Sequence, residues 1–306
     1  MMRAFFIWMS GNRTLRKIGE HSPMGRRVSG RFVAGTTIES AMTATQSVND
    51  LGMSVSIDNL GENVTNPAEA RESAQLYHQI LDAIHDKKLN ANVSLKLTHM
   101  GLDVDEAMAR DLVSGLVAKA ASRDSFVRVD MEGSPYTQRT LDFVRELHRR
   151  PGHANHVGAV IQSYLRRSKK DTEDLLNERI RIRLCKGAYK EPADIAFQKK
   201  SEVDESYVAL TKTLLKSGVY HGIATHDEAI IRQTIEFARA EKIPADAFEF
   251  QMLFGIRRDL QQQLVRDGWR MRVYIPFGTE WYPYFMRRLA ERPANVFFVV
   301  KNMFRK

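Results

Sequence analysis

The sequence contains a single cysteine, Cys185, among 306 residues. One cysteine cannot build an internal disulfide framework or a cysteine-rich zinc site, and it fits a reducing compartment. The chain also lacks a G-x-G-x-x-G fingerprint and a Walker pattern, so nothing supports a Rossmann nucleotide site or a P-loop. Internal repeats, low-complexity segments and long linkers are missing as well. These absences leave a globular chain whose length suits one large domain or two small ones.

Positive charge is concentrated at the N-terminus. Residues 1–35 hold seven Lys and Arg against one acid, a net of +6 out of +9 for the whole chain. The apolar run at residues 1–9 is far too short to span a bilayer, and its charges lie on the wrong side for a secretory signal. Such an arm can contact an anionic membrane surface or nucleic acid, but more often it is a helix that covers the protein. We expect a basic N-terminal helical arm over residues 1–35 and one catalytic domain over residues 36–306.

Short β-rich runs alternate with longer helical patterns through the rest of the chain. Their starts lie 23 to 41 residues apart, which is the length of a βα unit. Eight parallel strands alternating with helices favour a closed (β/α)8 TIM-type barrel of the α/β class, with an open doubly wound sheet as the alternative. The strands are expected at residues 53–57, 92–97, 126–131, 157–162, 180–186, 221–226, 248–253 and 271–275.

Helix starts are marked by capping residues. Thr36 and Glu39 have the spacing of a capping box for a helix that precedes the first strand. Asn66 followed by Pro67 and Glu69 predicts the start of the next helix. Further helices are expected at residues 105–122, 137–149, 171–177, 203–217, 227–240 and 256–267.

Polar side chains mark the end of every predicted strand. In a barrel these ends meet at one face, where functional groups gather. Charged residues inside apolar strands are seldom buried without partners, so several at one end of a barrel predict a site. The residues are Asp58, Lys96, Asp130 with Glu132, Gln162 with Tyr164, Arg183 with Lys186, His226 with Asp227, Gln251 and Tyr274.

Lys96 and Asp130 lie on neighbouring predicted strands, within reach of a salt bridge. Two chemistries are open for this pair. Lys96 can be the Schiff-base nucleophile of an aldolase-like lyase, assisted by Asp130, or a charged anchor for a substrate carboxylate. His226, Asp130 and Glu132 can be imagined as metal ligands, but their spacing matches no specific metal motif, so we expect no metal.

Two further stretches indicate a cofactor. Gly187 and Ala188 follow the strand of Arg183, and small residues there let a large flat or phosphorylated ligand lie against the main chain. Thr225 and His226 lead into a helix start, where free N–H groups can hold phosphate. Together they suggest a ring near the fifth strand and phosphates near the sixth.

A short helix with two arginines follows the eighth strand. Pro283 suits its first turn and Pro293 cannot lie inside it. Arg287 and Arg288 share a face with Tyr284, and adjacent guanidiniums suit a small carboxylate. The ordinary alternative is a solvated basic face. After the eighth strand of a barrel, we expect this helix to lie over the mouth.

These segments resemble the proline dehydrogenase family in its short monofunctional bacterial form, which is similar to the dehydrogenase domain of the bifunctional proline utilisation enzymes. The resemblance covers about residues 35–300. The matching segments, in order, are VSLKL at 93–97, VDME at 129–132, IQSYL at 161–165, RLCKGAY at 183–189, ATH at 224–226, FEFQML at 248–253 and the stretch 274–288.

The resemblance implies a (βα)8 barrel with its final helix over the mouth, and FAD bound without a Rossmann domain. It implies oxidation of L-proline to Δ1-pyrroline-5-carboxylate by hydride transfer to FAD N5, with electrons passed to a membrane quinone. Arg287, Arg288 and Lys96 would hold the proline carboxylate. Tyr274 would pack against the ring. Asp130 would pair with Lys96 and keep the pocket polar.

Cofactor roles follow from the same resemblance. Arg183 would lie beside the flavin N5, and Gln162 would hydrogen-bond the edge of the isoalloxazine. Glu62 would close a gate by pairing with Arg287. Two residues depart from the family pattern: Cys185 stands where an aliphatic residue is usual, and Asp227 where asparagine is common. The remaining cofactor contacts would be Met131, Lys186, Gly187, Ala188, Thr225 and His226.

The chain shows no aldehyde dehydrogenase or DNA-binding segment. We therefore expect it to catalyse only the first step of proline catabolism, with a separate pyrroline-5-carboxylate dehydrogenase downstream and no nucleic-acid partner. We expect a cytoplasmic location, with peripheral contact to the inner face of the membrane through residues 1–35.

Overall fold

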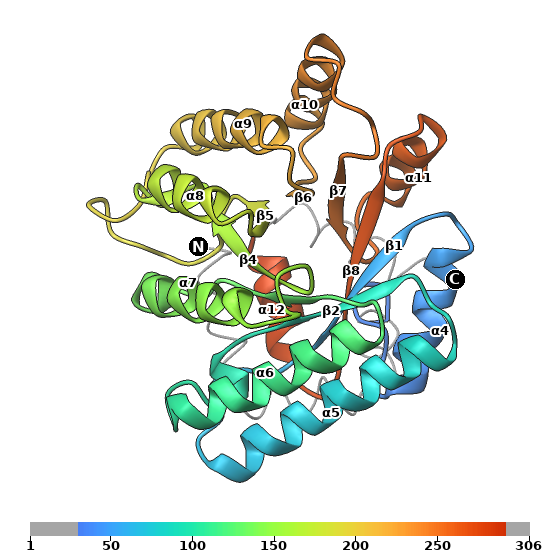
Figure 1. Ribbon diagram of the computed structural model, residues 1–306. Coiled ribbons are helices and arrows are strands. Elements are labelled where there is room, and N and C mark those ends of the chain that lie inside the picture. Colours follow the sequence, from blue (N-terminus) through green and yellow to red (C-terminus); the bar gives the residue numbers. More distant parts are fainter. Residues whose placement is uncertain (1–29, 292–306) are drawn as a thin grey trace.

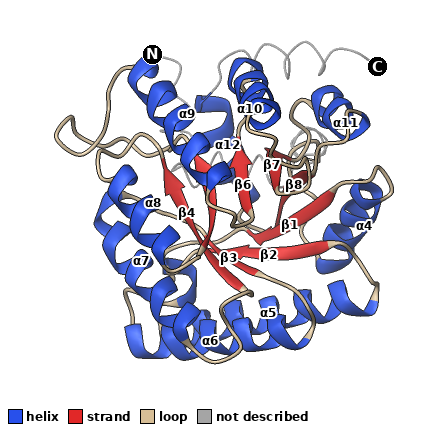
Figure 2. Cartoon of the chain, turned by 45° about the horizontal axis from the view of Figure 1, so that its top comes forward, coloured by secondary structure: helices blue, strands red, loops and turns tan. Residues whose placement is uncertain are grey.

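The computed structural model describes the backbone of residues 30–291 and the side chains of residues 30–286. Parallel strands pair in the order β1 to β8, and β8 pairs with β1, so the predicted barrel is confirmed. The strands lie inside a ring of helices (Figure 2). Their bounds are β1 Ser54–Asn59, β2 Ala91–Leu95, β3 Val127–Val129, β4 Val157–Gln162, β5 Arg181–Cys185, β6 His221–Ala224, β7 Phe248–Leu253 and β8 Met271–Phe277.

Helices cover the outside of this barrel (Figure 1). Strands and helices alternate along the chain, so that each strand leads into a helix. The first, α4, comes before β1, and the last, α12, follows β8. Their bounds are α4 Ile38–Asn49, α5 Pro67–Asp86, the 3-10 turn η1 Thr98–Met100, α6 Glu106–Ser122, α7 Ser134–Arg149, α8 Ser168–Asn177, α9 Lys200–Lys216, α10 Glu228–Ala240, α11 Arg258–Arg266 and α12 Trp281–Glu291.

The apolar core lies between the strands and these helices. Val55, Ile57 and Leu95 are fully buried on the outer face of the barrel wall. Burial of one such side chain stabilises the fold by about 1.5–3 kcal/mol. Because successive side chains of a strand point to opposite faces, the residues between them point into the barrel. That leaves Ser56 and Asp58 inside, where the site is built.

The first helix begins one residue later than the capping box at Thr36 and Glu39 predicted. Thr37 is the N-cap, and its hydroxyl accepts the backbone N–H of Ser40 at 3.2 Å. The Ser40 hydroxyl in turn accepts the N–H of Thr37. Ser40 therefore takes the role expected of a glutamate. At the next helix the prediction is confirmed, since Asn66 accepts the N–H of Glu69 and Pro67 stands at the first position.

Residues 30–35 cross the end of the barrel that α12 covers. They form a turn and an extended segment, so this end of the predicted helical arm is not helical; residues 1–29 lie outside the described residues. The N–H of Ala34 donates to the carbonyl of Pro276 at 2.9 Å, which ties the segment to β8. Phe32 packs on Phe285 of α12 with ring centroids 5.9 Å apart. Leu60, just after β1, joins this cluster.

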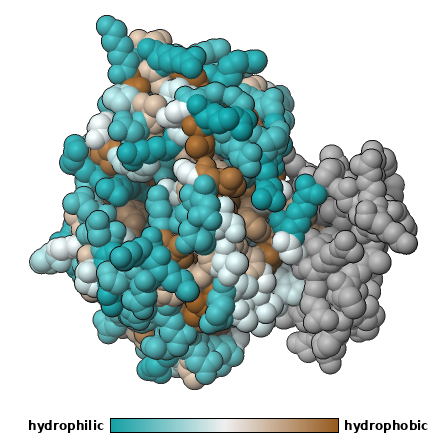
Figure 3. Space-filling model, turned by 90° about the vertical axis from the view of Figure 1, so that its right-hand side faces the viewer, coloured by the Kyte–Doolittle hydropathy of each residue, from teal (hydrophilic) through white to brown (hydrophobic). Residues whose placement is uncertain are grey.

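α12 therefore lies at the C-terminal ends of the strands, as predicted, and Figure 1 shows it within the ring of helices. The side of the molecule with α4 and α11 is mostly hydrophilic, with apolar residues in small areas (Figure 3). No helix in residues 30–291 has the length and apolarity needed to cross a membrane.

Candidate active site

Arg183 occupies the centre of the barrel and is almost fully buried. It comes from β5, and its guanidinium donates to four side chains on other strands. Nε donates to Gln251 Oε1 at 2.6 Å, and Nη1 to Asp130 Oδ1 at 2.6 Å. The remaining contacts are with the hydroxyls of Ser94 at 3.0 Å and Ser56 at 3.2 Å. The guanidinium is thus fixed from β1, β2, β7 and the end of β3.

Asp130 joins this guanidinium to Tyr274. Its Oδ1 also accepts the Ser94 hydroxyl at 2.8 Å, and its Oδ2 accepts the Tyr274 hydroxyl at 2.8 Å. The Tyr274 ring lies 5.2 Å from the guanidinium carbon of Arg183. Burial, together with the carboxylates of Asp130 and Asp58, holds the pKa of Tyr274 well above its usual value. The phenol therefore stays protonated and acts as a donor.

The expected ion pair between Lys96 and Asp130 is wrong. Lys96 Nζ lies 3.8 Å from Asp58 Oδ2, while Asp130 is taken by Arg183. Asp58 is itself buried, and the Tyr77 hydroxyl donates to it at 3.3 Å. β2 has β1 on one side and β3 on the other. The stagger of the strands brings the Lys96 ammonium against the carboxylate of β1.

The protonation state of Lys96 disfavours the Schiff-base interpretation. Burial alone would lower the pKa of Lys96, but Asp58 and Asp130 outweigh it and raise that pKa above its ordinary value. A Schiff-base lysine must present a neutral amine. Lys96 is instead a retained positive charge, with its side chain 16% exposed. That state suits an anchor for an anionic group.

Gln162 and Glu132 close the wall between β3 and β4. The Gln162 amide donates to the carbonyl of Glu132 at 2.8 Å. The Glu132 carboxylate accepts the hydroxyl of Thr98 at 2.7 Å, and its pKa is raised by burial. Met131, between Asp130 and Glu132, packs into the main core. Gln162 is therefore fixed at the end of β4, and Met131 belongs to the main core.

Lys186, just past β5, is held by two carboxylates. Its ammonium lies 2.5 Å from Asp204 of α9 and 3.1 Å from Asp227. Asp227 also caps α10, since it accepts the N–H of Ala229. Burial raises the pKa of Asp227, but Lys186 outweighs this effect and the net shift is downward. The site expected for phosphates thus contains a cation already balanced by two acids.

The loop between β6 and α10 is fixed by side chains that the sequence predicted for the cofactor. Thr225 Oγ1 accepts the N–H of Asp227 at 3.1 Å, and His226 Nε2 accepts the N–H of Leu253 at 3.0 Å. This contact of His226 ties the loop to β7. Its ring is partly exposed.

Gly187 and Ala188 leave the backbone bare beyond β5. Gly187 has a φ of +108°, which L side chains rarely adopt, and a Cβ there would overlap the ring of Tyr164. Ala188 is exposed. The absence of a side chain at Gly187 lets the main chain pack directly on the Tyr164 ring, which is itself buried. This contact fixes the main chain just past β5.

Arg287 and Arg288 lie on α12, but their side chains are outside the described residues. Glu62 is exposed on the loop between β1 and α5. The predicted pair between Glu62 and Arg287 therefore stays a prediction. The backbone of α12 packs at the correct end of the barrel for both arginines to serve the site.

The described residues do not meet the needs of a metal site. No three His, Cys, Asp or Glu side chains between residues 30 and 286 are placed to hold a metal ion.

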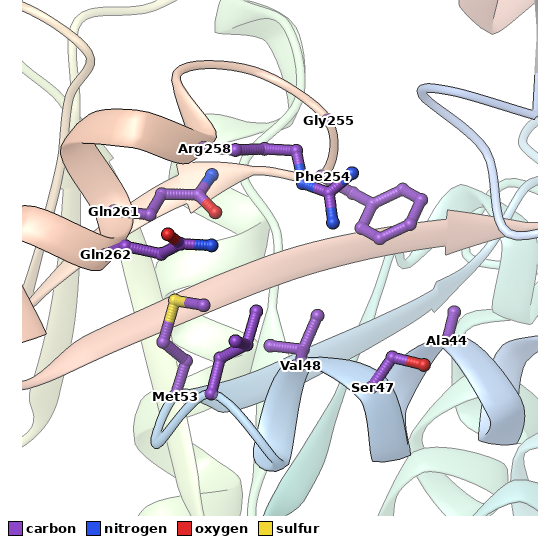
Figure 4. Close-up of a pocket in the computed structure, with 10 residues that line it drawn as sticks. Ala44, Ser47, Val48, Met53, Phe254, Gly255, Arg258, Gln261 and Gln262 are labelled. Carbon is purple, nitrogen blue, oxygen red and sulfur yellow. The ribbon is translucent and has the colours of Figure 1, made fainter.

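A hollow of about 210 Å³ lies outside the barrel wall between α4 and α11, where Arg258, Gln261 and Gln262 face Val48 and Met53 (Figure 4). None of the predicted site residues lines it.

Several residues of the network were not assigned a role from the sequence. The sequence predicts Asp58 and Gln251 only as polar strand ends, and it assigns no role to Ser56, Ser94 and Glu249. One signal was available for all of them. Ser56 with Asp58, Ser94 with Lys96, and Glu249 with Gln251 are polar pairs at alternate positions of apolar strands, which places both members on the inner face.

Comparison with known proteins adds a family match. The model described as proline dehydrogenase matches residues 41–301. Proline dehydrogenase 1 of Bacillus subtilis (strain 168) is 41% identical over 307 residues, covering 100% of both chains. Proline dehydrogenase of Deinococcus radiodurans is 45% identical over 277 residues, covering 89% of each chain.

A solved structure agrees on the fold. Proline utilization A from Bdellovibrio bacteriovorus, inactivated by N-propargylglycine, matches with a TM-score of 0.84 and 24% identity. The match covers 95% of this chain and 36% of that longer protein. At this identity the likeness concerns the barrel alone.

Proposed function

The chain belongs to the proline dehydrogenase family, and from this premise we propose that it oxidises L-proline to Δ1-pyrroline-5-carboxylate with FAD as cofactor and a quinone as electron acceptor. Enzymes of this family are oxidoreductases of proline catabolism. The observation that carries the proposal is the buried network of Arg183, Asp130 and Tyr274 beside a charged Lys96.

The proposed binding of L-proline rests on the positive charge of Lys96. The Lys96 ammonium stays protonated because its pKa is raised by Asp58 and Asp130 against the opposing effect of burial. A charged amine at the mouth suits the carboxylate of L-proline. Arg287 and Arg288 would complete the grip from α12, since paired guanidiniums hold a carboxylate by several charge-assisted bonds. Tyr274 would pack against the substrate ring.

The residues at the mouth fit a flavin. The main chain of Gly187 and Ala188, which Tyr164 fixes from one side, would lie along the flat ring system. Gln162, Met131 and Arg183 would flank it. Lys186, Thr225 and His226 would take the phosphates near the start of α10, where the helix dipole favours an anion. FAD bound there would supply the redox chemistry, as hydride acceptor at N5 for proline and as electron donor to a quinone.

The chain's own residues would contribute position and electrostatics. Asp130 holds the Arg183 guanidinium in one orientation, and Tyr274 bonds the far oxygen of the same carboxylate. Arg183 would present fixed positive charge toward the reacting atoms. Lys96 and the two arginines of α12 would hold the carboxylate, so that the ring carbon beside nitrogen is aligned for oxidation.

A visible absorption spectrum tests the proposal. The purified protein should be yellow and should bleach when L-proline is added without oxygen. D-proline is the matched control and should leave the colour unchanged. A colourless protein that borohydride traps with a keto substrate would instead support the Lys96 lyase.

The remaining partners belong to the same proposal. A membrane quinone as acceptor would bring the protein to the inner face of the membrane, with residues 1–35 as the contact and the cytoplasm as its compartment. A separate pyrroline-5-carboxylate dehydrogenase would consume the product. Vesicle sedimentation with and without residues 1–29 tests the contact and spares residues 30–35, which pack on α12 and β8; equal binding by both forms would reject it.

A further inference from the structure

Below Arg183, the barrel contains a second layer of buried polar groups that the proposed reaction does not use. Gln251 and Glu249 both lie on β7 and are each 4% exposed. The Gln251 side chain bridges two charges. Its Oε1 accepts Arg183 Nε–H at 2.6 Å, and its Nε2 donates to Glu249 Oε1 at 2.6 Å.

The chemistry of the two ends fixes which way the Gln251 amide points. The Nε of Arg183 is only a donor, so it needs the amide oxygen. An ionised Glu249 is only an acceptor, so it needs the amide nitrogen. A flipped amide would set donor against donor and acceptor against acceptor, both in a buried place where unmade hydrogen bonds are costly.

Glu249 is held ionised and in place from below. Arg272 Nε donates to its Oε1 at 2.6 Å, and the Tyr220 hydroxyl donates to its Oε2 at 2.9 Å. Burial would raise the pKa of Glu249, but Arg272 outweighs it and the net shift is downward. Gly222 on β6 leaves the space that this arrangement needs, since a Cβ there would overlap the Gln251 amide.

We propose that Gln251 is a positioning residue for Arg183, and that Glu249 sets the orientation of the Gln251 amide. The inference rests on the proposed function for the step that Arg183 supports. Gln251 and Asp130 grip different nitrogens of the same guanidinium. Together they leave it one orientation in the barrel. Gln251 itself acts only through Arg183.

Gln251→Met tests the role, because it keeps the length of the side chain and removes both hydrogen bonds. We expect kcat with L-proline to fall by about 10- to 100-fold, the value of a hydrogen bond to a charged group. KM should change much less, since Lys96 and α12 hold the carboxylate. Gln261→Met is the matched control. Gln261 is 3% exposed on α11, bonds only backbone carbonyls and lies outside the barrel.

A spectroscopic readout makes the test independent of turnover. In protein labelled with ¹⁵N-arginine, the Nε–H resonance of Arg183 is identified by its loss in Arg183→Lys. It should shift in Gln251→Met and stay in place in Gln261→Met. A purely structural role for Gln251 would lower the unfolding temperature of Gln251→Met and leave the ratio of kcat to KM unmoved.

Moving the carboxylate from position 249 to position 251 tests whether activity can be rescued. Gln251→Glu places two carboxylates side by side and should lose as much activity as Gln251→Met. Adding Glu249→Gln removes the repulsion between the two carboxylates and leaves a charged acceptor toward Arg183, while the new amide oxygen can still accept from Arg272. The double variant should recover at least about tenfold of the loss, because coupled neighbours are not additive. A double variant no better than Gln251→Glu overturns the proposal.

The two proposals fail differently. If the wild-type protein does not oxidise L-proline but the Arg183 resonance shifts in Gln251→Met, the function is wrong and the positioning role stands. If L-proline is oxidised and the resonance does not move, only the positioning role is lost.

Discussion

Removal of the Asp130 carboxylate should both destabilise the protein and stop its chemistry. Asp130 is the anionic partner of Arg183, whose side chain is 7% exposed. In Asp130→Ala the guanidinium keeps only neutral partners: Gln251, Ser94 and Ser56. In Asp130→Asn the amide oxygen still accepts from Arg183, and the Tyr274 hydroxyl can turn to accept from the amide nitrogen.

The two variants separate charge from shape. A buried charge left without its partner costs about 3–5 kcal/mol, which we expect for Asp130→Ala. Loss of charge assistance with the hydrogen bonds kept should cost about 1–3 kcal/mol in Asp130→Asn. Both should lower kcat/KM for L-proline by at least about 100-fold, the usual effect of removing a preorganised electrostatic group.

Urea unfolding followed by circular dichroism, and steady-state oxidation of L-proline, measure the two effects. Asp142→Asn is the control, since Asp142 is exposed on α7 and accepts only from Gln138; it should change stability by less than about 0.5 kcal/mol. If Asp130→Ala is no less stable than Asp130→Asn, the argument from an unpaired buried charge is refuted. Wild-type rates in Asp130→Asn would refute the electrostatic role.

Three more outcomes follow from the structure. Tyr274→Phe keeps the ring 5.2 Å from Arg183 but removes the bond to Asp130, so kcat/KM should fall about tenfold; unchanged kinetics would contradict this. Gly187→Ala forces a side chain into a φ of +108° and against Tyr164, which displaces the main chain past β5, and should weaken FAD binding by at least about tenfold, as measured by quenching of flavin fluorescence; equal affinity would count against a role of this main chain in flavin binding. Burial lowers the pKa of His221 to about 3. Its neutral ring therefore favours the fold fully above pH 6.5, the value of the unfolded state, and this contribution is lost as pH falls toward 3. The free energy of unfolding should fall by about 2 kcal/mol from this group between pH 7 and pH 5, and His221→Asn, which keeps an acceptor for the Ile182 N–H, should show a flatter pH profile than the parent.

The sequence predicted the barrel well because strand periodicity and capping are local properties. The runs at residues 157–162 and 248–253 match β4 and β7 residue for residue. The predicted strands and helices differ from the observed ones only in where they begin and end. β8 continues through Pro276 to Phe277, since the Pro276 carbonyl still accepts the N–H of Ala34 and its missing N–H is not needed there.

Partners across the barrel could not be predicted in the same way. Arg183 meets Ser56, which is 127 residues away in the chain, because β5 and β1 lie on opposite sides of a closed ring. Nothing local to either residue specifies this contact. For Lys96 the neighbouring strands offered two acids, Asp58 and Asp130. The choice between them depends on the strand stagger, which only the closed barrel fixes.

The polar interior of this barrel has a consequence for how the chain reaches its fold. Arg183 draws its partners from the first strands and from β7, near the two ends of the sequence. A nascent chain that has made β1 to β5 holds a guanidinium that still lacks Gln251 and the carboxylate network anchored on Arg272 of β8. Desolvation of that charge disfavours closure until β7 and β8 arrive. A chain that holds β1 to β5 already pairs Arg183 with Asp130, so we expect the last strands to complete the polar interior rather than to start it.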